Sequence, residues 1–485
     1  MSKEAYANSA QMYFSGSLGV LVSRAVGIVA GIFSLWLLTR ILSVEAFAGY
    51  MLAMSLVFVL GFIASFGLER VLLLKISPLT PEPGRLWGGR LTRKIAIWVA
   101  LLSSAAAVLT IVVLQSLPAL SAKNDLAGWF VILSPIVPAV AMTALLVAWL
   151  QSNHSVGRPQ TIYGQVDGLR CLGFGLVFVI GAGAWAVALA AVVASILPPA
   201  IMAARTIGNS IPEPGDFGLS DVWAGLYFFG MRFATIGFLH ADILILGLFA
   251  PPEVLGPYVV ASRFALILEA GHQIFAPAYT PRARRHIEAG AQSLAAREYN
   301  VSRTLGFLAS GTAALCFMIV GQPLLDQFGA GDEAFDILLL LCAGQLLLVG
   351  AGLHAIHMSM SNHLSVATAI QLGCLLVFVS LLLLLVPKYA AFGAAISFVI
   401  AQALLAACGT LVLWRIAGIR AWDPVSLASY AAAVGSLICA GLAPDYLGSA
   451  GAVLLLSLGL LAVRELDLLR SILKESLAQL TGSGR

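Results

Sequence analysis

The stretch RFATIGFLHADILILGLFAPPEVLGPYVVASR, residues 232–263, decides the fold. A long apolar segment carries an arginine near its start, a short turn carries a glutamate, and a second apolar segment opens with a tyrosine. Residues 24–55 follow the same plan at an offset of 208 positions. At this offset the identical pairs include Arg24 with Arg232, Glu45 with Glu253, Tyr50 with Tyr258 and Ala53 with Ala261. This shared placement of rare polar residues predicts an internal duplication.

Composition places the chain in the membrane. Of its 485 residues, 60% are hydrophobic and only 10% are charged, which is more apolar surface than a soluble domain of this size can bury. A helix needs about 20 apolar residues to cross a bilayer, and about 14 segments of that kind can be drawn here. The sequence therefore predicts an all-α polytopic membrane protein with spans at 18–38, 48–74, 95–117, 126–150, 163–181, 184–204, 222–249, 255–279, 305–321, 336–357, 366–386, 391–414, 426–442 and 447–463.

The repeat predicts the domain organisation. Its offset covers six predicted spans, an even number, so both copies enter the membrane from the same side and form a parallel repeat. We expect two pseudo-symmetric six-helix bundles with a cavity between them near the midplane. The expected divisions are an N-terminal bundle at 1–216, a C-terminal bundle at 217–416, and two additional transmembrane helices with a cytoplasmic tail at 417–485, with the Pro- and Gly-rich segment 211–218 as the linker between bundles.

Positive charge predicts the orientation. With the N-terminus in the cytoplasm, most Lys and Arg residues fall on the cytoplasmic side, and only Arg40, Lys123 and Lys388 fall on the opposite side. Both termini are therefore expected in the cytoplasm. The basic polar loop expected at 280–304 is explained by this orientation signal, and the alternative is a site for anionic lipid or a partner.

The charges within the spans are the candidate functional residues. Five arginines fall within or at the edge of apolar spans: Arg24, Arg70, Arg170, Arg232 and Arg263. A charge at a helix centre costs about 2.5–3.5 kcal/mol on the insertion scale, so such residues are expected to have a function or a partner. Arg70 can reach the interface from the end of its span. Arg24 lies about two turns, or roughly 9 Å, into its span, and Gly27 and Gly31 on the same face indicate a contact with protein.

Few acidic residues are available to neutralise these arginines. Asp167 and Arg170 are three residues apart, so an ion pair between them is expected, with a structural role as the alternative to one in transport. The remaining acids can reach Arg24, Arg232 and Arg263 only across helices. A cationic cavity is therefore predicted, in which Arg24, Arg263 and Arg232 hold an anionic group such as a phosphate, and internal salt bridges are the alternative for all three.

A second set of polar residues is a candidate for coupling. Asp242, Glu269 and His272, together with the pair Asp167 and Arg170, could relay protons or bind a coupling ion, H+ or Na+. His354, His357 and His363 lie near one helix end, but no acid or thiol is close to them, so no metal site is predicted.

Enzyme signatures are missing from the sequence. No lysine follows a glycine, so no Walker A loop can be drawn, and there is no HExxH or GxSxG motif. A transporter is therefore predicted rather than an enzyme, without a cofactor and without a nucleic-acid partner.

Four segments resemble a known family. They are SRAVGIVAGIFSLWLLTRILSVEAFAGY (23–50), ADILILGLFAPPEVLGPYVVASR (241–263), LLDQFGAGDEAFDILLLLCAGQ (324–345) and PKYAAFGAAIS (387–397). In their order and spacing they are similar to the polysaccharide transporters of the MOP (MATE-like) superfamily, especially Wzx-type flippases of lipid-linked oligosaccharide and O-antigen. Together they span most of residues 14–416.

The resemblance implies a flippase of the bacterial inner membrane. It would move an undecaprenyl-pyrophosphate-linked oligosaccharide across the membrane by alternating access, for the biosynthesis of a cell-surface polysaccharide such as lipopolysaccharide or exopolysaccharide. The cationic cavity of the family falls on Arg24 and Arg263, and less closely on Arg232, while Asp242 matches an acid common in the seventh span. Expected partners are the lipid-linked oligosaccharide, membrane lipids, and the polysaccharide polymerase and glycosyltransferases of the pathway.

Three alternatives remain open at this stage. A lipid II flippase would share the fourteen spans and the cationic cavity. A MATE-type exporter of cations or drugs would share the two bundles, but with twelve spans and a cavity dominated by acids. A membrane-embedded polysaccharide polymerase or ligase belongs to a different class, and it would be expected to carry a large outer loop.

Overall fold

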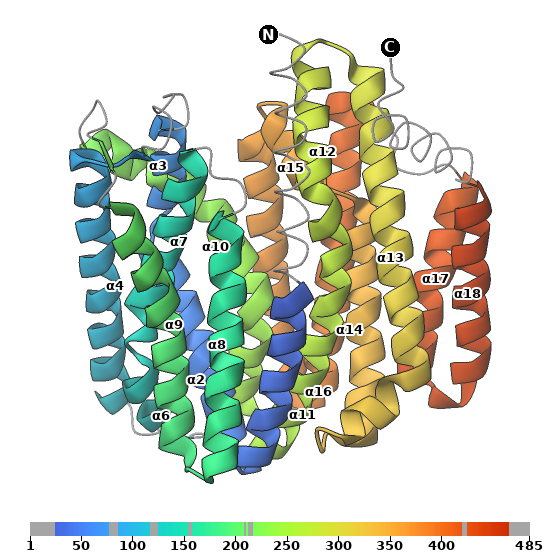
Figure 1. Ribbon diagram of the computed structural model, residues 1–485. Helices are drawn as coiled ribbons and strands as arrows, with labels where there is room; N and C mark the ends of the chain where they lie inside the picture. The colour runs from blue at the N-terminus through green and yellow to red at the C-terminus, as the bar shows by residue number, and fades with distance from the viewer. Residues whose placement is uncertain are drawn as a thin grey trace, which may run out of the picture. The chain divides into compact units, whose positions relative to one another are not determined.

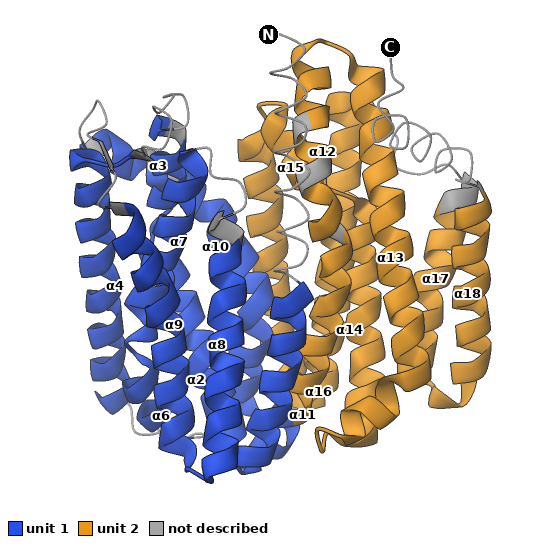
Figure 2. Cartoon of the chain, viewed as in Figure 1, with its two compact units in different colours: residues 1–256 blue, residues 257–485 orange. Residues whose placement is uncertain are grey.

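The computed structural model describes residues 25–76, 86–116, 125–153, 158–207, 210–211, 217–419 and 424–464, and these residues are almost entirely helical (Figure 1). The chain divides into two compact units, Met1–Gly256 and Pro257–Arg485 (Figure 2). We describe each unit by itself. The predicted domain boundaries at 216 and 416 stay a prediction. They rest on an internal duplication, whereas the two units are defined by which helices contact one another.

The first unit holds most of the candidate site. It contains a helix at Ala25–Ile41, then α2 (Val44–Ala64), α3 (Leu68–Ile76), α4 (Arg90–Ser116), α6 (Leu126–Leu133), α7 (Ile136–Ser152), α8 (Arg158–Ile180), α9 (Ala184–Ile207) and α10 (Leu219–Phe249), and α11 (Pro252–Ala265) begins in it. Two short strands, β1 (Leu86–Trp87) and β2 (Ser210–Ile211), pair in parallel. This pair could not be predicted, because two-residue strands carry no periodicity.

The second unit is helical throughout its described residues. After α11 it contains a 3-10 turn η2 (Leu266–Glu269), α12 (Ala270–Glu288), α13 (Gln292–Asp326), α14 (Gly331–Ala351), α15 (His354–Met360), α16 (Leu364–Ala417), α17 (Pro424–Leu442), a 3-10 turn η3 (Pro444–Tyr446) and α18 (Leu447–Arg464). The helix α16 covers 54 residues, but Ala390 has a non-helical backbone (φ 47°, ψ −123°) that divides it into two apolar helical segments.

The fourteen predicted spans each coincide with a helix or a helix pair. Among the described residues, ten helices are long and apolar enough to cross a membrane alone, and α6 with α7 is a candidate for one further span, bent by 47°. The shorter helices Ala25–Ile41 and Leu427–Leu442 correspond to the first and thirteenth predicted spans, and α16 contains the eleventh and twelfth. The prediction of an all-α polytopic membrane protein is confirmed.

Two of the predictions about local structure are wrong. The second span, expected to be continuous from 48 to 74, is broken between α2 and α3. The polar loop expected at 280–304 is helical except at residues 289–291, because α12 and α13 extend beyond their apolar parts. The center of the expected linker and the charged tail after residue 464 lie outside the described residues.

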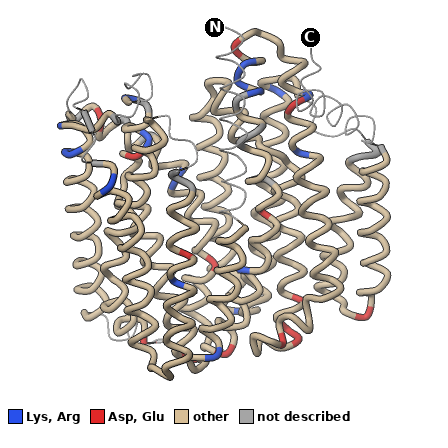
Figure 3. Tube along the Cα trace, viewed as in Figure 1, with Lys and Arg blue, Asp and Glu red and all other residues tan. Residues whose placement is uncertain are grey.

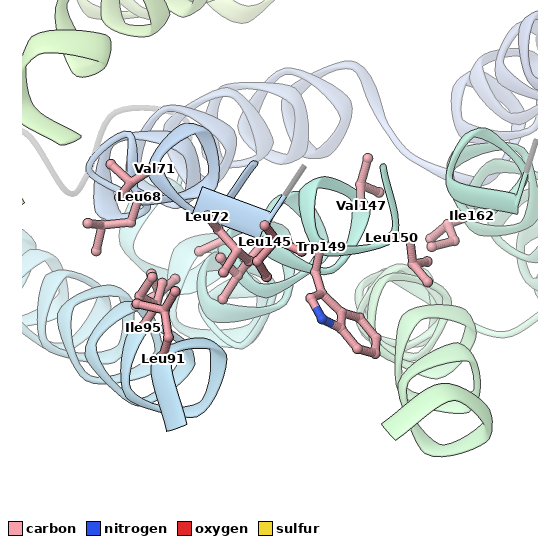
Figure 4. Close-up of a cluster of buried hydrophobic side chains, with 13 residues drawn as sticks. Leu68, Val71, Leu72, Leu91, Ile95, Leu145, Val147, Trp149, Leu150 and Ile162 are labelled. Atoms are coloured by element: carbon pink, nitrogen blue, oxygen red, sulfur yellow. The ribbon is translucent and has the colours of Figure 1, made fainter. Parts of the chain in front are cut away.

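The core of the first unit is a cluster of apolar side chains between α3, α4, α7 and the start of α8 (Figure 4). Leu72, Ile95 and Val99 are completely buried there, and Trp149 is 3% exposed. The opposite face of α4 is exposed, with Leu101 and Leu109 each 63% exposed. Such a continuous apolar surface is suited to lipid rather than to water.

Two hydrogen bonds join β1 to the end of α7 beside this core. The backbone N–H of Trp87 donates to Asn153 Oδ1 at 2.6 Å, and the Trp149 indole N–H donates to the Trp87 carbonyl at 2.5 Å. These bonds satisfy backbone groups of a strand whose sheet has only two members. They fix the ends of α4 and α7, and so support α3, which packs on α7.

Candidate functional site

The candidate site in the first unit is built on a pair of antiparallel elements, in which α10 packs along α2 and then α3. Four contacts fix their register. Gly247 of α10 lies against Leu52, the His240 ring stacks on Phe58 at 5.7 Å, and the Phe229 ring stacks on Phe66 at 5.2 Å. Lys75 at the end of α3 forms an ion pair of 2.6 Å with Asp221 in the first turn of α10.

The break between α2 and α3 determines where the charged residues of α3 lie beside α10. Phe66 (φ 51°) and Gly67 (φ 72°) both have left-handed backbones, which end α2 and restart the helix in a new direction. At Gly67 the chain approaches α10 so closely that an added Cβ would lie 2.2 Å from the carbonyl oxygen of Gly225. Only glycine fits there, for both conformation and space. The new helix carries Glu69 and Arg70 in its first turn.

Arg232 is the charge nearest the middle of α10. It lies about 20 Å along the helix from Leu219 at 1.5 Å per residue, and it is partly buried. Its Cζ lies 4.4 Å from the centroid of the Phe62 ring, which is a cation–π contact. Among the residues that the structure describes, Arg232 forms no ion pair, and its Nε has no hydrogen-bond partner.

Arg232 belongs to a group of charges from three helices. It acts electrostatically on Arg70 of α3 and on Tyr163 of α8, and Glu69 acts on the same two residues. Glu69 is 7% exposed, and its Oε2 has no hydrogen-bond partner in the described part of the chain. Arg70 is exposed and Arg232 is partly buried, so the group combines two guanidinium groups of different exposure with one buried carboxylate. Figure 3 shows that charges elsewhere gather mainly near helix ends.

Asp167 and Arg170 extend the polar face of α8. Their side chains form the ion pair expected from their spacing, with 3.6 Å between Arg170 Nη1 and Asp167 Oδ1. Arg170 also donates to the Ser195 hydroxyl on α9 at 3.4 Å. A Cβ added at Gly27 would lie 3.5 Å from Asp167 Oδ2, so the first described helix runs beside this pair. Arg24, the first residue of the predicted cationic cavity, lies outside the described residues.

Asp242 occupies a different level of α10. It is 5% exposed, and its Oδ1 lies 2.8 Å from the backbone N–H of the next residue, Ile243. His240, two residues earlier, is 3% exposed and stacks on Phe58. Both residues lie two to three turns beyond Arg232, so Arg232 and Asp242 lie at separate positions along α10.

The remaining predicted residues lie in the second unit. Arg263 is partly buried in the last turn of α11, just before the helix tightens into η2. Glu269 ends that 3-10 turn and accepts a hydrogen bond from Gln273 Nε2 at 2.9 Å. His272 lies in the first turn of α12. The described residues contain no group of three or more His, Cys, Asp or Glu side chains that could hold a metal ion.

Sequence reasoning missed Glu69, Arg70 and Tyr163 as members of the site. Arg70 was expected to reach the interface because it lies near the end of a continuous span. Arg70 is exposed, but because of the break at Phe66 and Gly67 it lies in the first turn of a new helix, and the aromatic–glycine pair within an apolar run was the available signal for that break. Tyr163 carried no signal, because one tyrosine at a span entrance is common in membrane helices.

Comparison with known proteins shows which solved structures have a similar fold. No family model matches the sequence, and no curated protein matches it. Among solved structures, the lipid II flippase MurJ in an inward closed conformation is similar, with a TM-score of 0.68 and 14% identity over 93% of this chain and 99% of that chain.

Two further transporters are similar in structure. An inward-facing multidrug resistance MATE family transporter of the MOP superfamily has a TM-score of 0.60 and 11% identity, over 83% of this chain and 99% of that one. A MOP superfamily transporter from Pyrococcus furiosus Vc1, described by the reverse polarity of its binding pocket, has a TM-score of 0.55 and 13% identity, over 85% and 96%. These likenesses show that this chain has the fold of the MOP superfamily transporters.

Proposed function

We propose that this protein is a flippase, which moves a saccharide linked to a polyprenyl pyrophosphate across the membrane by alternating access. The observation that carries the proposal is the pair of arginines, Arg70 and Arg232, which act on one another within the first unit. Like charges repel each other, and neither arginine has an ion pair among the described residues. A diphosphate would relieve this repulsion.

The chemistry of the pair suits a diphosphate better than a cationic drug. A guanidinium holds phosphate oxygens through two parallel N–H···O bonds and stays charged in apolar surroundings. A cationic substrate would require an excess of acids, whereas the acid beside Arg70 in the first turn of α3 is the single residue Glu69. The ring of Phe62 beside Arg232 adds an apolar wall that excludes water from the headgroup.

The proposal also gives a role to each of the other predicted residues. Arg24 and Arg263 would each bind an anionic group of the substrate, while Asp242, Glu269 and His272 would serve coupling to H+ or Na+. The lipid tail would stay in the bilayer, and the exposed apolar faces of the helices support such a position. The protein would act in the bacterial inner membrane with both termini in the cytoplasm, beside the polymerase and glycosyltransferases of a polysaccharide pathway.

A lipid II flippase is the second candidate, and the likeness to MurJ favours it, since that fold matches 93% of this chain against 83% for the MATE transporter. Lipid II and an oligosaccharide precursor share the polyprenyl pyrophosphate and differ in the sugar. The arginine pair recognises the shared part, so both candidates predict the same role for it.

The test is leaflet exchange in liposomes that contain the purified protein. We expect the native chain to exchange a fluorescent pyrophosphate-linked oligosaccharide lipid, and the substitutions Arg24→Ala and Arg263→Ala to slow exchange by about tenfold or more, since each removes a charge-assisted bond of roughly 1.5–3 kcal/mol. A parallel assay with lipid II separates the two candidates by relative rate.

The control is a liposome that carries a cationic dye. Efflux of the dye without exchange of either lipid would contradict the flippase proposal and support a cation exporter. Exchange at the native rate in both variants would assign Arg24 and Arg263 to internal salt bridges instead.

A further inference from the structure

A predicted span is also interrupted in the second unit. The span expected at 336–357 is divided into α14, which ends at Ala351, and α15, which begins at His354. Gly352 between them has φ 77° and ψ −167°, a conformation that is essentially restricted to glycine. Broken helices within a membrane free backbone groups that need partners, and in transporters they mark sites of substrate or ion binding.

Two tyrosines donate hydrogen bonds to carbonyl groups near the end of α14. The Tyr299 hydroxyl of α13 donates to the Ala351 carbonyl, and the Tyr430 hydroxyl of α17 donates to the Leu347 carbonyl at 2.7 Å. Tyr430 packs so tightly that an added Cβ at Gly350 would lie 1.9 Å from its ring. The break is therefore held from both sides, and α17, one of the two helices beyond the predicted repeat, takes part in holding it.

His357 lies one turn into α15 and is completely buried. Its ring lies against two tyrosine rings, at 5.8 Å from Tyr299 and 6.4 Å from Tyr279. Its Nδ1 is 2.5 Å from the Tyr279 hydroxyl of α12. Its Nε2 has no hydrogen-bond partner among the described residues. One nitrogen of this imidazole is thus engaged, and the other is vacant.

The surroundings of His357 contain no acid in direct contact. From α16 the neighbours in this cluster are apolar, with Ala367 and Leu413 packed in the same core. The titratable groups on the other elements are Tyr279 on α12, Glu298, Tyr299 and Arg303 on α13, His354 and His363 at the two ends of α15, and Tyr430 on α17. Arg303 acts on Tyr299 and Tyr430, and Glu298 acts on Tyr279.

We propose that His357 is the binding site of a coupling proton, and that its protonation opens the packing around the break between α14 and α15. This proposal rests on the proposed function, because it names the proton site that would couple transport. The geometry that carries it is a wholly buried imidazole with one free nitrogen, placed at a break that three tyrosines hold closed.

The coupling follows from the hydrogen-bond geometry. A neutral imidazole has one donor and one acceptor nitrogen, and a protonated one has two donors. On protonation Nδ1 must donate to Tyr279, and Nε2–H needs an acceptor that the closed cluster lacks. A buried, unpaired cation is costly, so protonation favours an arrangement in which water or an acidic group reaches Nε2.

The test compares the pH dependence of leaflet exchange in the native chain and in His357→Gln. We expect the native rate to change by about tenfold between roughly pH 4 and pH 7, because a wholly buried imidazole gives up its proton more readily than one in water. We expect the rate of His357→Gln to change by less than about twofold over the same range, since no imidazole is left there to bind the proton. His286→Gln, at the far end of α12, is the matched control and should keep the native profile.

Two further measurements keep the proposal testable if His357→Gln fails to fold. Tyr279→Phe preserves the ring contact and removes the hydroxyl, so it should shift the pH midpoint of exchange without abolishing exchange. NMR of 15N-histidine in the detergent-solubilised native protein should show one imidazole, absent from His357→Phe, that becomes protonated over this range.

The outcomes distinguish the two proposals. Absence of exchange in the native chain at every pH would contradict the proposed function, and the NMR titration would still report on the proton site. Exchange whose pH profile survives in both His357→Gln and Tyr279→Phe would overturn the proton site alone. An imidazole of His357 that stays neutral until the protein unfolds would also overturn it.

Discussion

Substitution of Arg232 by glutamine is expected to slow leaflet exchange of the lipid-linked saccharide by about 10- to 100-fold. The substitution keeps a hydrogen-bonding side chain but removes the charge and the second donor of the guanidinium. A hydrogen bond to a charged group contributes about 1.5–3 kcal/mol, and each 1.4 kcal/mol corresponds to a factor of about ten. The Phe62 ring would also lose its cation–π contact. Initial rates of exchange at several protein-to-lipid ratios measure the effect.

Arg40→Gln is the matched control for this substitution. Arg40 also lies over an aromatic ring, with its Cζ 5.7 Å from the Trp36 centroid, but it is exposed near the end of its helix. It should therefore exchange lipid at close to the native rate. Equal losses in Arg40→Gln and Arg232→Gln would show that the assay responds to positive charge in general, and the arginine pair would lose its assigned role.

Substitution of Gly67 by alanine is expected to have the largest effect on stability. Alanine in the left-handed conformation costs about 1–2 kcal/mol for the backbone alone. The added Cβ would also lie 2.2 Å from the Gly225 carbonyl oxygen and 3.0 Å from the Phe229 nitrogen, so α3 and α10 would have to separate. The midpoint of thermal unfolding in detergent should fall, and exchange should be lost because Arg70 leaves its position.

Gly181→Ala separates the two contributions. Gly181 has the same left-handed backbone, with φ 71°, but nothing lies within 4 Å of the position of its Cβ. It should lose only the conformational part, so its unfolding midpoint should fall much less than that of Gly67→Ala. Equal shifts for the two variants would mean that the close approach of α3 to α10 does not matter for stability.

The helices were predictable from sequence because each depends on local composition. An apolar segment of about 20 residues has few alternatives to a membrane-spanning helix, so fourteen spans could be located from hydropathy alone. The breaks were harder, since Phe66 and Gly67 differ little from other residues in a long apolar run. Their conformation is decided by α10, which is more than 150 residues away in the sequence and packs against the break.

The candidate site was likewise predictable only where it depends on spacing within one helix. The pair of Asp167 and Arg170 followed from a spacing of three residues on one helix, and the distance of 3.6 Å agrees with it. The grouping of Arg70, Tyr163 and Arg232 depends on three helices that meet through tertiary packing. No pattern within one helix encodes that meeting. The same is true of His357, whose tyrosine neighbours come from α12 and α13.

The most direct test of the central proposal is a binding measurement with two short-chain polyprenyl lipids that differ only in the headgroup, one a pyrophosphate and the other a neutral alcohol. We expect the native protein to bind the pyrophosphate at least about tenfold more tightly, which corresponds to about 1.4 kcal/mol, and Arg232→Gln to lose most of this preference. Equal affinity of the native protein for both lipids would contradict the proposal that the arginine pair recognises the diphosphate.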